Sequence, residues 1–329
     1  MQKMFSKSSF IILVIFLLSG FLLAKKLLPD NQQQFNKEES FYKVGLIKIL
    51  DHPALDATEK GFLTYFKEKS PQSQVFAESA QADLNIANQI IQKFIQRKVD
   101  VIITVGTTVS QIAMKKTKKI PIVFASVTDP LTSGLVASFE RPGGNITGVS
   151  NFTPTLIDKS LYSFKKILPN LKKLGIIYNP GEANSVLLLA KTNEVAQALG
   201  IEIKSLAAQN TNEAVFAAQN LAGSVDAFFI NNDNTALAAI GGIVQGVGKI
   251  PVFSSDLDTF DQGVLAAFGP DQYRIGEKVA KLALSILKHE AFPVNTPVIF
   301  PEDTQLLINK KVDNKLGLKL DFDLVDNLK

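Results

Sequence analysis

The sequence predicts an α/β protein with two Rossmann-like lobes, each built on a parallel sheet. The first observation is that continuous apolar runs, typical of buried strands, alternate with segments of helical periodicity. The second is that this alternation starts again near the middle of the chain. The third is size, because 329 residues, 46% of them hydrophobic, suffice for about two separate cores.

Short matches between the two halves support a duplicated architecture. They occur in the same order and at a nearly constant offset, which favours two similar lobes over the alternative of one larger α/β sheet. The matching pairs are Lys43–Ile47 with Lys173–Ile177, Val99–Asp100 with Val225–Asp226, and Lys119–Val123 with Lys249–Phe253.

The elements follow in order along both halves. In the first half, strands are predicted over 44–50, 99–105 and 120–127, and helices over 55–66 and along the stripe of Leu84, Ala87, Ile91 and Phe94. In the second half, strands are predicted over 174–178, 201–206, 227–230, 250–254 and 263–268, and helices over 186–199, 213–221 and 274–287. Gly200 supplies a natural C-terminal cap for the helix before it. The first lobe is therefore predicted over 42–149 with part of 267–290, and the second over 150–266 with part of 291–320.

The N-terminal segment has the shape of an export signal. Lys3 and Lys7 precede the apolar run Phe10–Ala24. As a helix this run would span about 22 Å, less than the ~30 Å hydrocarbon core, so a cleaved signal competes with a short retained anchor. Phe21 stands where a lipoprotein would carry its lipidated Cys, and no small-x-small cleavage site is evident, which favours the anchor over a signal or a buried helix. Residues 1–40 are predicted to be this signal or anchor plus a polar spacer, and the protein to be periplasmic or otherwise extracytoplasmic.

Composition excludes several chemistries. The net charge is only +4, which argues against nucleic acid as a partner. Cysteine is absent, and the two histidines, His52 and His289, are far apart, so neither a metal site nor a cofactor is predicted. The lysine run 115–119 is interpreted as a solvated helix end, with a DNA or lipid role as the alternative.

Polar turns follow the predicted strands in both halves. In parallel α/β sheets, ligands bind beyond the carboxyl ends of the strands, where free N–H groups and helix dipoles are available. These turns therefore predict a cleft between the lobes, although each Ser, Thr, Asn or Asp could instead be an ordinary helix N-cap. The predicted ligand-binding residues are His52, Leu55, Thr107, Thr108, Ser126, Thr128, Asn184, Ser185, Asp233, Asn234 and Asp256.

Their chemistry suits a zwitterion. Thr107, Thr108 and Ser185 are predicted to hold a carboxylate, and Asp233 and Asp256 an ammonium group. An enclosed charge left unpaired costs several kcal/mol, so these groups would also confer specificity.

Several of these strings together resemble a known family, the ABC-transporter substrate-binding proteins of the tryptophan/tyrosine type. The resemblance covers roughly residues 42–317 and is carried by the strings Asp51–Asp56, Pro121–Phe124 with Val127–Pro130, Pro142–Ser150, Tyr178–Ser185 and Asp233–Thr235. It implies the type 1 periplasmic-binding-protein fold and a component that delivers an amino acid, often aromatic, to a membrane permease. The chain departs from the family at Phe21, at Gly106–Thr108 and at Asn231–Asn232.

The sequence thus predicts the binding component of an ABC importer, monomeric and without catalytic residues. No Gly-x-Ser-x-Gly elbow accompanies His52, and no Walker-type phosphate loop occurs, so an enzyme is not expected. The alternatives are a membrane-tethered sensor of the same fold, a sugar or other small-solute binder, and a hydrolase that would turn its ligand over.

Overall fold

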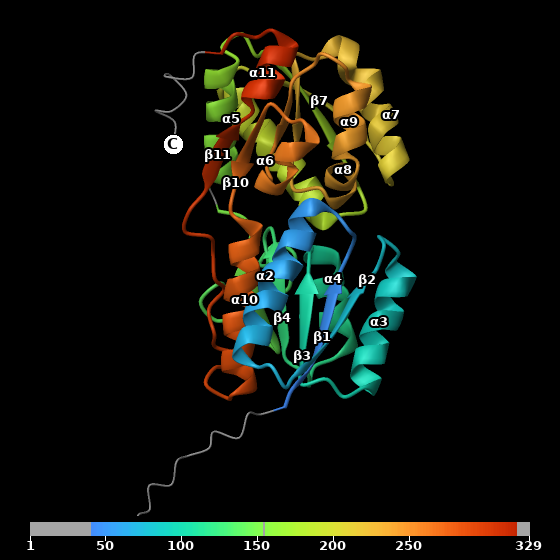
Figure 1. Cartoon of the computed structure of the whole chain (residues 1–329), viewed down its shortest axis with the longest axis vertical. Helices are drawn as coiled ribbons and strands as arrows, with labels where there is room; N and C mark the ends of the chain where they lie inside the picture. The colour runs from blue at the N-terminus through green and yellow to red at the C-terminus, as the bar shows by residue number, and fades with distance from the viewer. Residues whose placement is uncertain (1–40, 154, 321–329) are drawn as a thin grey trace, which may run out of the picture. The chain divides into compact units, whose positions relative to one another are not determined.

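Two separate sheets carry the helices of the chain (Figure 1). The computed structural model describes residues 41–153 and 155–320, and the unit from Phe41 onward has its own cores. The predicted signal or anchor of residues 1–40 lies outside the described residues. Within the described ranges, no helix is both long enough and apolar enough to cross a membrane.

The first sheet has the strand order β2-β1-β3-β4-β5, and all its strands are parallel. The strands are β1 (Lys43–Lys48), β2 (Gln74–Ser79), β3 (Val101–Val105), β4 (Ile122–Val127) and β5 (Ile146–Ser150). The strands β3, β4 and β5 are buried along their whole length, as expected in a parallel sheet covered by helices.

Four helices cover the first sheet: α2 (Pro53–Lys69), α3 (Leu84–Gln96), α4 (Thr107–Lys116) and, from much later in the chain, α10 (Gln272–Leu287). Helices α2 and α10 lie side by side (Figure 1). Glycines make this close approach possible, because a Cβ at Gly276 would lie 2.0 Å from the Thr58 carbonyl oxygen.

The second sheet has the strand order β11-β10-β9-β8-β6-β7. Its strands are β6 (Lys173–Tyr178), β7 (Glu202–Ala207), β8 (Ala227–Ile230), β9 (Val252–Ser254), β10 (Ala266–Gly269) and β11 (Gln305–Ile308). Only β11 is antiparallel, to β10. The covering helices are α5 (Leu156–Ile167), α6 (Ala183–Ala198), α7 (Thr211–Leu221), α8 (Asn234–Ala238), α9 (Ile240–Gly246) and α11 (Lys310–Leu316), with short 3₁₀ segments η1 (Ala222–Ser224) and η2 (Leu257–Gln262).

The chain passes between the two sheets three times. It leaves the first sheet after β5, returns after β10 to form α10, and passes Ile299, which bridges to Val149 of β5, before it enters β11. The predicted α/β class with two mainly parallel sheets is confirmed. The exact lobe limits drawn from the sequence stay a prediction.

Candidate ligand-binding site

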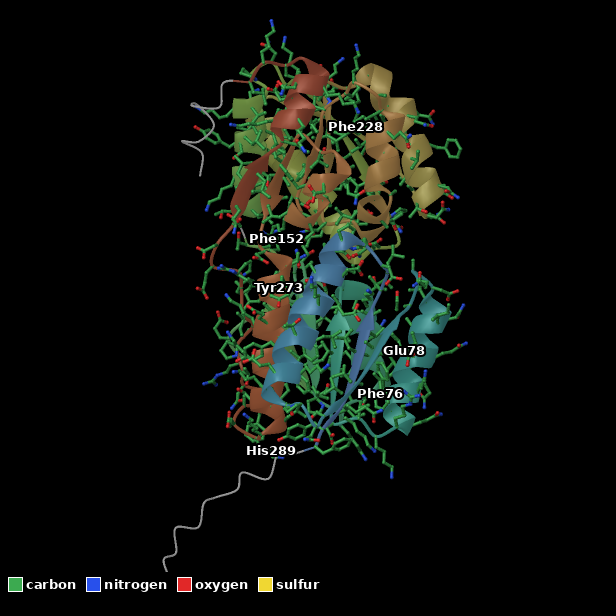
Figure 2. All side chains as sticks on the ribbon, in the orientation of Figure 1. Phe76, Glu78, Phe152, Phe228, Tyr273 and His289 are labelled. Carbon is green, nitrogen blue, oxygen red and sulfur yellow. The ribbon has the colours of Figure 1, made fainter. Side chains whose placement is uncertain are left out.

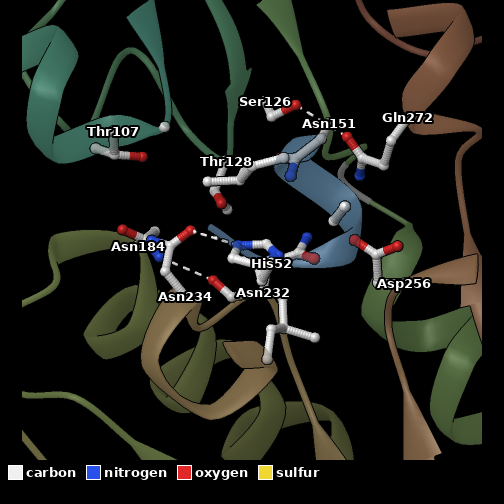
Figure 3. Close-up of a pocket in the computed structure, with 14 residues that line it drawn as sticks. His52, Thr107, Ser126, Thr128, Asn151, Asn184, Asn232, Asn234, Asp256 and Gln272 are labelled. Carbon is white, nitrogen blue, oxygen red and sulfur yellow. Dashed lines mark hydrogen bonds between the residues drawn. The ribbon is translucent and has the colours of Figure 1, made fainter. Parts of the chain in front are cut away.

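A cavity lies where the carboxyl ends of the strands of both sheets meet (Figure 3). His52 follows β1, Thr107 follows β3 and Asn151 follows β5. From the second sheet, Asn232 follows β8 and Asp256 follows β9. The complete lining is His52, Ala54, Leu55, Gly106, Thr107, Ser126, Thr128, Asn151, Asn184, Asn232, Asn234, Leu237, Asp256 and Gln272.

Local backbone geometry on the first sheet aims these groups at the cavity. Gly106, the N-cap of α4, has φ 109°, a region that favours glycine, and α4 begins without a side-chain cap. Ser126 has φ 54° at an irregularity in the pairing of β4 with β5. Its Oγ donates to Gln272 Oε1 over 2.9 Å, and Thr58 Oγ1 donates to the same oxygen over 3.2 Å. Helices α2 and α10 are thus joined to the end of β4.

A buried carboxylate organises the opposite wall. Glu182 accepts hydrogen bonds from Asn234 N at 3.1 Å, Thr235 Oγ1 at 2.8 Å and Asn184 Nδ2 at 3.2 Å. Asn184 Nδ2 also donates to Asn232 O over 2.8 Å. These bonds hold the amide side chains of the second sheet in place at the start of α8.

One hydrogen bond joins the two walls directly. His52 Nε2 lies 3.3 Å from Asn234 Oδ1 (Figure 3). Burial lowers the pKa of His52, so the ring is neutral near pH 7, and Nε2 carries the proton that it donates to Asn234. The ring nitrogen Nδ1 is consequently an acceptor. The cavity has room for little more than a water molecule, so the two walls lie close together.

Unpaired polar atoms gather at this cavity. Within the described ranges, the buried side-chain nitrogens and oxygens that lack a hydrogen-bond partner all belong to residues of its lining. Four can accept a hydrogen bond and two can donate one. The acceptors are His52 Nδ1, Asn151 Oδ1, Asn184 Oδ1 and Asp256 Oδ2, and the donors are Asn232 Nδ2 and Gln272 Nε2. Because a buried unpaired polar atom costs about 1–3 kcal/mol, a cluster of them indicates a site built for a polar ligand.

Asp256 is the carboxylate of this cavity. Its side chain is 1% exposed; Oδ1 accepts from Asp258 N over 3.0 Å, and Oδ2 has no partner. Burial, and then the negative charge of Asp258, raises the pKa of Asp256 well above its usual range. A cation beside Oδ2 would restore the ionised form.

The structure gathers most of the residues that the sequence predicts for the site. Eight of them line the cavity: His52, Leu55, Thr107, Ser126, Thr128, Asn184, Asn234 and Asp256. Thr108, Ser185 and Asp233 do not belong to this lining.

Asp233 has a structural role, which replaces its predicted role as the partner of a ligand's ammonium group. Its carboxylate accepts from Ser185 Oγ, Asn179 N and Ala236 N, each at 2.6 Å, so it caps α8 and ties it to the start of α6. Ser185 donates to Asp233 and is likewise occupied. Thr108 lies one position further into α4 than the lining residue Thr107.

Sequence reasoning missed six lining residues: Ala54, Gly106, Asn151, Asn232, Leu237 and Gln272. Asn151 directly follows the string Pro142–Ser150, and Asn232 lies in a polar turn, so both could have been predicted from their position in the sequence. Gln272 could not, because the predicted helix began at Arg274, whereas Asp271 caps the helix and it begins at Gln272, two residues earlier.

Two mainly parallel α/β sheets around a shared polar cavity define the class of periplasmic-binding proteins of type 1. The model of the ABC transporter substrate binding protein family matches residues 43–326, and the chain belongs to this family. A tyrosine-binding protein of Clostridioides difficile is 30% identical over 306 residues, which cover 91% of this chain and 87% of the relative.

Two solved structures are informative about the arrangement of the sheets. A domain from Streptococcus pneumoniae in complex with L-Trp is 28% identical, with a TM-score of 0.80 over 84% of this chain and 95% of its own. A ligand-free, open substrate-binding protein from Clostridium difficile is 30% identical, with a TM-score of 0.63 over 84% of this chain and 95% of its own. The chain is therefore the substrate-binding component of an ABC transporter, of the tryptophan/tyrosine type, and binds a small ligand. Proteins of this family are extracytoplasmic solute-binding proteins, not enzymes.

Proposed function

We propose that the protein binds an L-amino acid in the cavity between its two sheets and delivers it to a membrane permease for import. The observation that carries the proposal is the cluster of unpaired buried acceptors and donors on the cavity lining. A zwitterion supplies both kinds of partner, since its ammonium donates three hydrogen bonds and its carboxylate accepts several.

The charged end of the ligand is assigned to the Asp256 side of the cavity. Asp256 Oδ2 accepts from the ammonium, and Gln272 Nε2 and Asn232 Nδ2, the two unpaired donors, bind the carboxylate. Thr107 lies on the opposite side of the cavity in Figure 3. Because the ammonium and carboxylate of an α-amino acid are adjacent, both are assigned to the Asp256 side, and the region around Thr107 receives the ligand's side chain in place of its carboxylate.

An aromatic amino acid is the proposed ligand. The support is the tyrosine-binding relative and the L-Trp complex. Ala54, Leu55 and Leu237 supply apolar surface in an otherwise polar lining.

Binding proceeds through an open form. The present structure is more similar to the L-Trp complex than to the open ligand-free relative, although both relatives have similar identity to it. The narrow cavity and the bond between His52 and Asn234 agree with a closed arrangement. The sheets must separate for a ligand to enter, and the ligand then favours closure, which the permease reads. We further propose that the chain is exported and held at the membrane through residues 1–40.

Asp256→Asn tests the assignment. Removing the charge that faces the ammonium is expected to weaken amino-acid binding by about 30-fold or more in calorimetry, since losing one partner of a buried charge pair costs about 2–5 kcal/mol. The matched control is Asp261→Asn, which removes a charge at an exposed position outside the lining. The ligand is first found by a thermal-shift screen of amino acids and sugars.

Three outcomes would contradict the proposal. Unchanged affinity of the Asp256→Asn protein would remove the ammonium site. A sugar that stabilises the protein when no amino acid does would favour the small-solute alternative. Turnover of the bound ligand would favour a hydrolase.

A further inference from the structure

The face of the first sheet opposite the cavity is unusually basic. Its strands are parallel and its helices run back against them, so α2, α3, α4 and α10 all end where the strands begin. We call this the basal face. The described chain begins on it, with Phe41 two residues before β1, and His289, just beyond α10, is labelled at this end of the first sheet in Figure 2.

Exposed cations gather on the basal face from several elements. The ends of α3 and α4 and the residues just beyond them contribute Arg97, Lys98, Lys115, Lys116, Lys118 and Lys119. Arg141, Lys288, Lys43 at the start of β1, and Lys67 and Lys69 at the end of α2 add five more, against four exposed acids, Glu68, Asp100, Glu140 and Glu290. Eleven positive against four negative groups leave an excess of seven, whereas the whole chain carries only +4.

Exposed apolar side chains accompany these cations. Phe41 is 56% exposed, Phe292 53% and Val294 50%. Hydrogen bonds connect the loops at the edge of this face. Gly143 N donates to Val294 O over 3.0 Å, and Asn145 Nδ2 donates to Ile120 O over 2.8 Å. Lysines interspersed with protruding apolar side chains are the composition of a surface that lies on a lipid headgroup layer.

We propose that the basal face docks on an anionic lipid bilayer. Sixteen residues, 25–40, separate the apolar run Phe10–Ala24 from Phe41 in the sequence. A chain of that length spans at most about 55 Å even when fully extended. If the run stays in the membrane, this limits how far Phe41 can lie from the surface, and the cations supply the second signal that stable membrane association requires. The cavity lies at the other ends of the strands, so docking leaves it accessible.

The docking proposal is separable from ligand binding. The unit from Phe41 onward has its own cores, and the solved relatives consist almost entirely of the same span, so a protein of residues 41–329 folds on its own. Without residues 1–40, any vesicle binding must come from this unit. Amino-acid affinity is expected to stay unchanged when vesicles are added.

The chain contains no tryptophan, which allows a direct optical test. In the 41–329 protein, F292W is expected to shift its emission to the blue when vesicles of phosphatidylcholine with phosphatidylglycerol are added, and not with phosphatidylcholine alone. F216W is the control, because Phe216 on α7 is 66% exposed on a helix of the second sheet. Equal shifts at both positions would show adsorption without a preferred face and would overturn the proposal.

Charge removal tests the same face without touching its apolar residues. The K115Q/K116Q/K118Q/K119Q protein is expected to lose at least about 100-fold in vesicle partitioning, since each cation near an anionic surface raises partitioning about five-fold. The matched control, K166Q/K172Q/K249Q/K311Q, removes four exposed lysines of the second sheet's region and is expected to retain vesicle binding. Equal losses of vesicle partitioning in both proteins would show that binding depends only on net charge. Binding to heparin or duplex DNA without any response to vesicles would assign the face to another polyanion, and either result overturns the proposal.

Discussion

Asp233 shows how a residue can have the right chemistry for a ligand and a different role. It is 2% exposed, and its three hydrogen bonds all come from the protein itself. Burial, and then the negative charge of Glu182, raises the pKa of Asp233 to about 7. The sequence located a polar turn correctly there but could not distinguish a saturated cap from a free carboxylate, because that difference depends on Asn179 and Ser185, some fifty residues earlier in the chain.

The raised pKa of Asp233 predicts how stability depends on pH. Between about pH 4 and pH 7 the unfolded chain releases the Asp233 proton while the folded protein keeps it, so the ligand-free protein loses stability as pH rises through this range. The loss should be on the order of 4 kcal/mol in urea unfolding, since each of the roughly three pKa units corresponds to about 1.4 kcal/mol. Asp233→Asn should flatten this pH dependence, and Asp261→Asn, at an exposed position of η2, should not. Equal slopes in all three proteins would contradict the assignment.

At the scale of elements, the presence of a continuous apolar run decided what could be predicted: β5 was missed although it is fully buried, because Thr147, Gly148 and Ser150 interrupt its apolar pattern. The fully buried strands β3, β4 and β8 were found within two residues, because continuous apolar runs are distinctive. Strand β2 was missed because Gln74–Ser79 lies half-exposed at the edge of its sheet. Strand β10 begins three residues later than predicted, since Gly263, with φ 91°, ends η2.

The close contact between α2 and α10 gives a prediction about packing. Gly276→Ala would place a methyl group against the Thr58 carbonyl and Phe62 N, backbone atoms of α2 that cannot move without the helix. We expect a loss of about 3 kcal/mol in the free energy of unfolding. Gly223→Ala is the control, because a Cβ there meets nothing within 4 Å. A Gly276→Ala protein as stable as the control would show that the helices separate easily.

At the scale of the whole molecule, His52 is the residue that joins the two walls of the cavity, through its hydrogen bond to Asn234. Eight of the predicted residues line one cavity because parallel sheets present their carboxyl ends to one place. The predicted set did not include Gln272, which arrives with the second crossing, far along the chain.

Removing the His52 side chain should favour the open form. Loss of one buried hydrogen bond is expected to change the ratio of closed to open ligand-free protein about 2- to 10-fold. The measurement is the radius of gyration by small-angle scattering, which should increase in His52→Ala. His289→Ala, at the only other histidine and on the exposed basal face, is the control. If the radius of gyration of His52→Ala equals that of the His289→Ala control, contacts other than the His52 bond hold the walls together.

Helix α10 lies far along the sequence, and this affects the order in which the parts of the first sheet are synthesised. Strands β6 to β10 are all synthesised before the helix that covers β4 and β5. During translation the earlier half therefore exposes an uncovered apolar surface, while the later half can already collapse around its own core. A nascent chain that ends at Ser150 should be a client of chaperones rather than a stable fragment, and export in an unfolded state would avoid premature pairing of an incomplete half.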